Sequence, residues 1–188
     1  NSDTNFKTYN YHNINGLPDW LFVPKQFIHP IELAKEYKIK FIQINTNSVN
    51  SNVMQETLNN IKTKSIIYSG VSGEIVCHEL VKNYSFIHCH PGTLPEFRGS
   101  TTLYYEILSN RFPSVSCIIL DKTIDTGPII ATKSFPIPYK TDNIDSLYEP
   151  SIRANLLCDV IYDSGMSLNI KSSSQIRNKK ALNYYIIH

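Results

Sequence analysis

The sequence lacks the long apolar and basic runs that mark membrane and nucleic-acid proteins. No apolar run approaches the roughly 18 residues that cross a bilayer, and no signal peptide is visible. Arg177, Lys179 and Lys180 form only a minor basic spot, and the formal net charge is +2. We therefore expect neither a membrane partner nor a nucleic-acid partner. With 41% hydrophobic and 18% charged residues, the composition is typical of a globular protein.

Closely spaced cysteine pairs are also absent. The four cysteines, Cys77, Cys89, Cys117 and Cys158, lie far apart in apolar surroundings. Reduced core cysteines of intracellular proteins have this distribution, so we expect a cytoplasmic location. An initiator methionine is lacking as well, which is consistent with a piece cut from a longer protein. A fusion to another domain and a homodimer both remain open.

Short apolar segments alternate with segments of helical spacing along the 188 residues. Strands are predicted at 20–23, 40–45, 65–69, 85–88 and 117–120, and helices at 30–37, from 50 or 51 to 61, at 74–81 and at 101–108. Further on, we predict an edge strand at 134–138, a helix at 144–161 bent by Pro150, and a final strand at 184–187. This order predicts an α/β, Rossmann-like fold with a mostly parallel sheet and helices on both faces.

Two histidines and a carboxylate stand at the ends of predicted strands. His88 closes the strand 85–88, His90 begins the turn after it, and Asp125 lies in the turn after the strand 117–120. Open α/β sheets bind ligands at the carboxyl ends of their strands, so we expect the three side chains to meet in one crevice.

Each of these groups has a catalytic and a structural interpretation. An imidazole with an ordinary pKa of about 6.5 suits proton transfer near neutral pH. His90 therefore either takes part in catalysis or simply hydrogen-bonds a loop carbonyl. Asp125 either orients His90 and accepts a proton, or caps its own turn as an Asx residue.

A series of short motifs connects these positions. In order along the chain stand His88-Cys89-His90-Pro91, Leu94-Pro95, Arg98-Gly99 and Asp125-Thr126-Gly127-Pro128-Ile129. The series resembles the formyltransferase family, which includes methionyl-tRNA, glycinamide ribonucleotide and sugar N-formyltransferases. In that family a strand ends in Asn-x-His-Pro, followed by Leu-Pro, Arg-Gly and Asp-x-Gly-x-Ile.

The resemblance departs from the family at two points. His88 stands where the family has Asn, and the family's opening strand with its glycine turn has no evident counterpart. That first unit either was lost from this chain or the fold has been trimmed. On this basis we expect a formyltransferase-like catalytic domain at 1–165, with a C-terminal arm or final strand of the same domain at 166–188.

The resemblance implies N-acyl transfer, in which a formyl or acetyl group moves to the primary amine of a small acceptor. His90 would polarise the acyl carbonyl and stabilise the oxyanion, and Asp125 would take the proton of the amine. His88 would replace the Asn as a hydrogen-bond donor, or belong to a pocket changed for another acyl donor, or pack beneath the strand. The size and near-neutral charge fit a nucleotide-linked amino sugar best.

The same resemblance implies two sets of binding residues. The acyl donor, either 10-formyltetrahydrofolate or acetyl-coenzyme A, would lie along Tyr68, Gly70, Val71 and Gly73. The acceptor would contact Pro91, Arg98, Gly99, Tyr104, Thr126 and Gly127.

Two other classes of function compete with acyl transfer. His88 and His90 with Asp125 have a spacing that suits a zinc-dependent hydrolase. That interpretation leaves the Leu-Pro and Arg-Gly motifs unexplained, and we predict no metal. A non-catalytic binding domain that has kept the fold is the third possibility.

Overall fold

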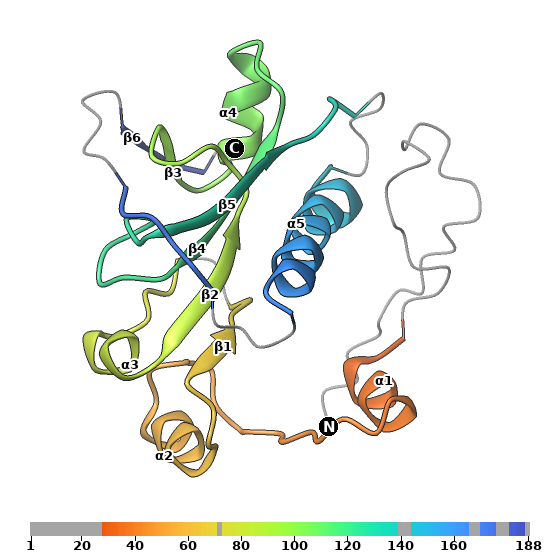
Figure 1. The fold of residues 1–188 in the computed structure, drawn as a ribbon, viewed down its shortest axis with the longest axis vertical. Coiled ribbons are helices and arrows are strands. Elements are labelled where there is room, and N and C mark those ends of the chain that lie inside the picture. Colours follow the sequence, from red (N-terminus) through yellow and green to blue (C-terminus); the bar gives the residue numbers. More distant parts are fainter. Residues whose placement is uncertain (1–27, 71–72, 139–143, 166–169, 176–180, 187–188) are drawn as a thin grey trace.

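A central sheet lies between two layers of helices in a computed structural model of the chain (Figure 1). The structure describes residues 28–70, 73–138, 144–165, 170–175 and 181–186. Four strands form the main sheet in the order β1-β2-β4-β5, with bounds β1 Ser65–Ile67, β2 Ser85–His90, β4 Ser114–Ile119 and β5 Ile129–Ser134. A second sheet pairs β3 (Phe97–Gly99) with β6 (Leu182–Tyr184).

The α/β class is confirmed, and the strand directions differ from the expectation in part. Among the described strands of the main sheet, β1 and β2 run parallel, whereas β4 is antiparallel to both β2 and β5. The connection 120–128 is short, which explains why β4 and β5 are antiparallel, because a parallel crossover needs a dozen or more residues. In the small sheet, β3 and β6 run parallel.

The two faces of β2 carry different helices, as the alternation of a strand requires. Phe86 packs with Leu80 of α3 (His78–Asn83) and Leu58 of α2 (Asn52–Asn60). Ile87 and Cys89 point to the opposite face, where a larger core forms against α5 (Glu149–Asp163). Figure 1 shows α5 on one side of the sheet, with α2 and α3 on the other. The expected helices on both faces are therefore present.

Most predicted helices are observed, with shifts that have local causes. α1 (Pro30–Glu36) and α2 form as expected, and the Ser51 side chain caps α2 by accepting from the Met54 N–H. α4 runs from Thr102 to Leu108, also as expected. The helix predicted at 74–81 begins only at His78 in α3, because the Asn50 side chain accepts the Cys77 N–H and holds Cys77 in an extended conformation.

The segment predicted as one helix at 144–161 forms two helical elements that meet next to Pro150. A π-helical turn, Ile144–Tyr148, leads directly into α5. Pro150 lies in the first turn of α5, where a missing N–H costs no helical hydrogen bond. The proline therefore marks the beginning of the α-helix.

Three strand predictions need correction. Residues 40–45 form no strand, and Phe41 and Ile42 are 47% and 44% exposed. The predicted edge strand 134–138 lies earlier, as β5, and ends before the prolines that define the segment. The strand predicted to stop at His88 continues through His90, which pairs with Ser116 of β4. The predicted strand 20–23 lies outside the described residues.

None of the helices in the described ranges combines the length and apolar character needed to span a membrane.

A buried carboxylate fastens the loop that follows β2. Glu106 of α4 has 0% exposure. Its two oxygens accept the backbone N–H groups of Thr93 and Ser114 at 2.8 and 2.7 Å. The Ser116 hydroxyl accepts the Leu94 N–H at 3.1 Å. These bonds join the loop to α4 and β4, so they fix the position of the loop directly after His90, the last residue of β2.

We expect Glu106→Gln to lower the free energy of unfolding by about 2–4 kcal/mol. The new amide N–H₂ faces one of the two backbone N–H groups, and leaving that buried N–H without an acceptor costs about 1–3 kcal/mol. The hydrogen bond to the other N–H also weakens, because its acceptor is no longer charged. Urea denaturation checks this against Glu56→Gln, which changes an exposed glutamate of α2. Equal stability losses in the two variants would contradict the role given to Glu106.

Candidate active site

A cavity of about 550 Å³ lies at the carboxyl end of β2. Its wall combines the segment after β1, the end of β2, the loop 120–125, and parts of α4 and α5. Of the residues predicted from the sequence, those that line it are Tyr68, Gly70, Gly73, His88, His90, Pro91, Gly99, Tyr104 and Asp125. Arg98, Thr126 and Gly127 do not line it, and Val71 lies outside the described residues.

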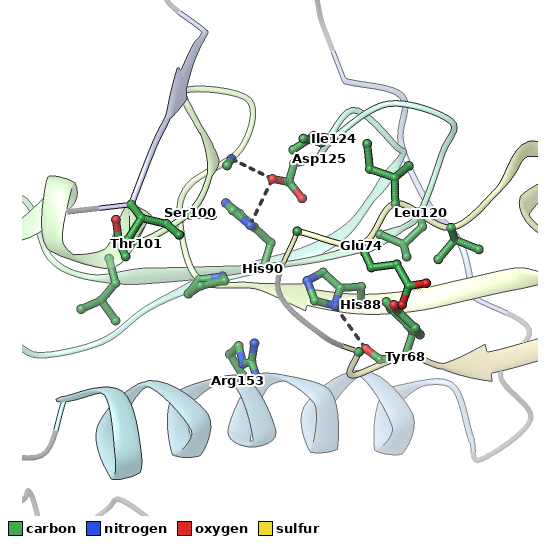
Figure 2. Close-up of a pocket in the computed structure, with 18 of the residues that line it drawn as sticks. Tyr68, Glu74, His88, His90, Ser100, Thr101, Leu120, Ile124, Asp125 and Arg153 are labelled. Atoms are coloured by element: carbon green, nitrogen blue, oxygen red, sulfur yellow. Dashed lines mark hydrogen bonds and ion pairs between the residues drawn. The ribbon is translucent and has the colours of Figure 1, made fainter. Parts of the chain in front are cut away.

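His90 is held at both ring nitrogens, and Figure 2 shows the contact of one of them with Asp125. Nε2 lies 2.7 Å from the Phe97 carbonyl oxygen, and Nδ1 lies 3.5 Å from Oδ2 of Asp125. A carbonyl oxygen only accepts hydrogen bonds, so Nε2 carries a proton. The side chain is 3% exposed, which leaves the ring little freedom to rotate.

Asp125 reaches His90 from a left-handed turn, with φ of 51°. Its Oδ2 accepts the Gly99 N–H at 2.8 Å. The Gln175 amide donates to the carbonyl oxygens of Asp125 and Gly127, both at 2.8 Å. These bonds stabilise a conformation that non-glycine residues seldom adopt.

The other motif residues hold this turn together. Arg98 Nη2 donates to the Gln175 side-chain oxygen at 2.8 Å, so the guanidinium is directed to Gln175. A Cβ at Gly127 would lie 1.7 Å from the Ile119 carbonyl oxygen, so only glycine fits there. Thr126 hydrogen-bonds Thr123 of the same turn. In this arrangement all three shape the loop that carries Asp125.

His88 lies on the same face of β2 as His90 and has a different hydrogen bond. Its Nδ1 is 3.1 Å from the Tyr68 carbonyl oxygen, so Nδ1 carries the proton of the neutral ring. Burial lowers the pKa of His88 below its ordinary value, and the charges of His90 and Arg153 act in the same direction. The Tyr68 carbonyl and Asp125 oppose this effect without reversing it.

One end of the cavity suits a flat, partly polar ring system. The Tyr68 hydroxyl is buried without a hydrogen-bond partner among the described residues. Its pKa is raised, mainly by burial and to a smaller extent by the negative charge of Glu74. Gly70 packs directly on this ring, since a Cβ there would overlap the hydroxyl. Apolar walls come from Val76, Leu120 and Ile124. The Tyr68 ring and the apolar walls, rather than the buried hydroxyl, are the surfaces that a flat ring system would contact.

The other end of the cavity carries acidic groups that sequence analysis missed. The Tyr104 hydroxyl donates to Asp145 Oδ1 at 2.6 Å. Glu149 accepts from Arg153, with Nε and Oε1 3.3 Å apart. The pKa of Glu149 lies above its ordinary value, chiefly because the side chain is buried. Arg153 lowers this pKa in part, and Asp145 raises it. The spacing of four between Asp145, Glu149 and Arg153 places them on one helix face, and this signal was available in the sequence.

The described residues include no group of three or more His, Cys, Asp or Glu side chains arranged to hold a metal ion. Nδ1 of His88 is turned to the Tyr68 carbonyl, while Nδ1 of His90 is turned to Asp125.

Comparisons with known proteins point to one class. No protein-family model matches the chain. The methionyl-tRNA formyltransferase of Wolbachia pipientis subsp. Culex pipiens (strain wPip) is 30% identical over 131 residues, which are 67% of this chain and 43% of that protein. The methionyl-tRNA formyltransferase of Caldanaerobacter subterraneus subsp. tengcongensis is 25% identical over 136 residues, 71% of this chain and 42% of that protein. The chain thus spans less than half the length of these curated relatives.

Solved structures agree on the fold. The methionyl-tRNA formyltransferase of Clostridium thermocellum superposes with a TM-score of 0.59 and 17% identity, covering 82% of this chain and 64% of that one. The formyltransferase PseJ of Anoxybacillus kamchatkensis superposes with a TM-score of 0.60 and 17% identity, covering 84% and 82%. The fold is therefore of the formyltransferase type. Together with the sequence relatives and the ordered motifs, it shows that this chain belongs to the formyltransferase family.

The lowered pKa of His88 predicts a pH-dependent stability. The unfolded chain takes up the proton near pH 6.5 and the folded chain only at lower pH, so the free energy of unfolding falls as pH falls from about 6.5 through the folded pKa. His88→Asn removes this part of the decline. We expect the stability of the wild type relative to the variant to decrease from pH 7.5 to pH 5, as measured by urea denaturation. Two parallel pH curves would contradict it.

Proposed function

We propose that the chain is an N-formyltransferase domain that transfers a formyl group from 10-formyltetrahydrofolate to the primary amine of a small acceptor. The contact between His90 and Asp125 carries this proposal. It lies at the wall of a cavity that is also lined by the apolar side chains of Val76, Leu120 and Ile124 and by the carboxylates of Asp145 and Glu149.

The residues of the chain divide the work as follows. When bound, 10-formyltetrahydrofolate supplies the formyl carbon; Tyr68, Gly70 and the apolar wall would hold its ring system. His90 polarises the carbonyl oxygen through Nε2–H, which we take to be shared with the Phe97 carbonyl. Asp125 keeps the His90 ring in this orientation and stabilises positive charge on it.

We propose a nucleotide-linked amino sugar as the acceptor. The carboxylates of Asp145 and Glu149 and the hydroxyl of Tyr104 suit the hydroxyl and amine groups of a sugar ring. Among the fold neighbours, PseJ is described in complex with UDP-4,6-dideoxy-4-formamido-L-AltNAc and tetrahydrofolate.

Methionyl-tRNA is a second candidate acceptor, because the sequence relatives are methionyl-tRNA formyltransferases. An acetyl donor, by contrast, has no support among the relatives and fold neighbours named above, each of which is described as a formyltransferase.

A donor and acceptor screen tests the proposal. The protein is incubated with 10-formyltetrahydrofolate or acetyl-coenzyme A, together with nucleotide-linked amino sugars or methionyl-tRNA, and product masses are read. We expect a gain of 28 Da, the mass that replacing H by CHO adds, on an amino sugar with the formyl donor only. Product on methionyl-tRNA alone would reassign the acceptor, and no formylated product at all would overturn the proposal.

With an acceptor in hand, we expect His90→Asn and Asp125→Ala each to lower kcat by about 10²–10⁴-fold, the usual contribution of a positioned acid or base. His78→Ala is the matched control, because His78 is exposed and does not line the cavity. Steady-state kinetics with circular dichroism of each variant provide the check. Turnover in folded His90→Asn that equals the control would remove the mechanism.

A further inference from the structure

We propose that His88 is the proton acceptor for the attacking amine. The proposal rests on the formyl transfer proposed above and assigns a different role to the position where the family has Asn. An Asn amide would donate a hydrogen bond there, whereas the imidazole offers a lone pair. Three features of the structure carry this inference.

The first feature is the tautomer of the ring. The Tyr68 carbonyl oxygen only accepts hydrogen bonds, and it lies 3.1 Å from Nδ1 of His88. The neutral ring therefore keeps its proton on Nδ1, and Nε2 presents a lone pair. A neutral His88 in this orientation cannot donate a hydrogen bond to a developing oxyanion.

The second feature is the position of Nε2. His88 lines the cavity on the same face of β2 as His90, and both rings are seen there in Figure 2. Within the described part of the chain, Nε2 has no hydrogen-bond partner, and it is not among the buried polar atoms without one. The lone pair is thus accessible from the cavity, beside the group that we assign to the carbonyl.

The third feature is the set of charged groups around the ring. His90 precedes the turn on the same strand, Arg153 approaches from α5, and Asp125 comes from the loop 120–128. Burial, His90 and Arg153 all favour the neutral form of His88, and only Asp125 and the Tyr68 carbonyl oppose it. His88 is therefore in its proton-accepting form at neutral pH.

The proton and the bonds balance in the proposed step. The lone pair of the amine nitrogen forms the new N–C bond to the formyl carbon while the π pair of the C=O bond moves to the oxygen, and the surplus proton on the amine nitrogen moves to Nε2 of His88. The C=O π bond then re-forms, the C–N bond to the donor breaks, and its electron pair stays on the donor nitrogen. His88 returns the proton to that nitrogen and is neutral again.

The tautomer can be measured without any turnover. Two-bond ¹⁵N–¹H correlation spectra of the full chain at pH 7.5 report which ring nitrogen carries the proton. The His88 signals are assigned by their loss in His88→Asn. We expect a neutral ring protonated at Nδ1. A proton on Nε2, or an imidazolium at this pH, would overturn the proposal.

The role can be separated from a hydrogen-bond donor by comparing two variants. We expect both His88→Ala and His88→Asn to lose about 10²-fold in kcat, at the low end of the range for a general base, with KM changed less than about threefold. Added imidazole should restore turnover in His88→Ala only, since the cavity left by the ring admits it. His78→Ala again serves as the exposed control.

The outcomes distinguish this inference from the function on which it depends. Wild-type protein without formyl transfer to any amine would remove the proposed function, while the spectra would still report the tautomer. An active wild type with His88→Asn equally active would show that an amide donor suffices and would refute a proton-accepting His88. Failure of imidazole to restore a folded His88→Ala would refute it as well.

Discussion

One carboxylate oxygen joins the three chain segments that build the site. Oδ2 of Asp125 accepts the Gly99 N–H of β3 and lies against Nδ1 of His90 at the end of β2. The Asp125 side chain is only 12% exposed, and a carboxylate that is largely shielded from water destabilises the fold unless its partners are in place. The carboxylate therefore requires β2, β3 and the loop 120–128 to keep their relative positions. The cavity keeps its shape because the contacts that satisfy the Asp125 carboxylate also fix the segments that form its wall.

Gln175 and Tyr184 take part in this arrangement from far along the sequence. Gln175 holds the Asp125 turn through two carbonyl groups and is itself oriented by Arg98. In the small sheet, the Phe97 ring stacks on Tyr184 with centroids 5.2 Å apart, so β6 supports the carbonyl that His90 contacts. The left-handed φ of Asp125 costs about 1 kcal/mol or more, which these contacts offset.

Local signals in the sequence predicted the helices and the meeting of His90 with Asp125, whereas longer-range pairing determined the rest. Periodicity and a capping serine gave α2, because a helix forms from neighbours in sequence. No local sequence pattern predicts that Phe97–Gly99 pairs with Leu182–Tyr184, because this pairing depends on tertiary packing. The direction of Arg98 depends on Gln175, and could not be inferred from the Arg-Gly motif alone.

The two histidines of β2 show how one strand presents opposite chemistry two residues apart. His90 has its proton on Nε2, fixed by the Phe97 carbonyl, whereas neutral His88 has its proton on Nδ1, fixed by the Tyr68 carbonyl. An accepting backbone oxygen thus decides in each case which nitrogen carries that proton. The other ring nitrogen faces Asp125 in His90 and has no hydrogen-bond partner among the described residues in His88. Substituting His for Asn at this position keeps the polar group at the cavity wall but reverses its polarity, from a donor to an acceptor. The hydrogen bonds of His90, Asp125 and Gly99 can then stay as they are, because none of them runs through His88.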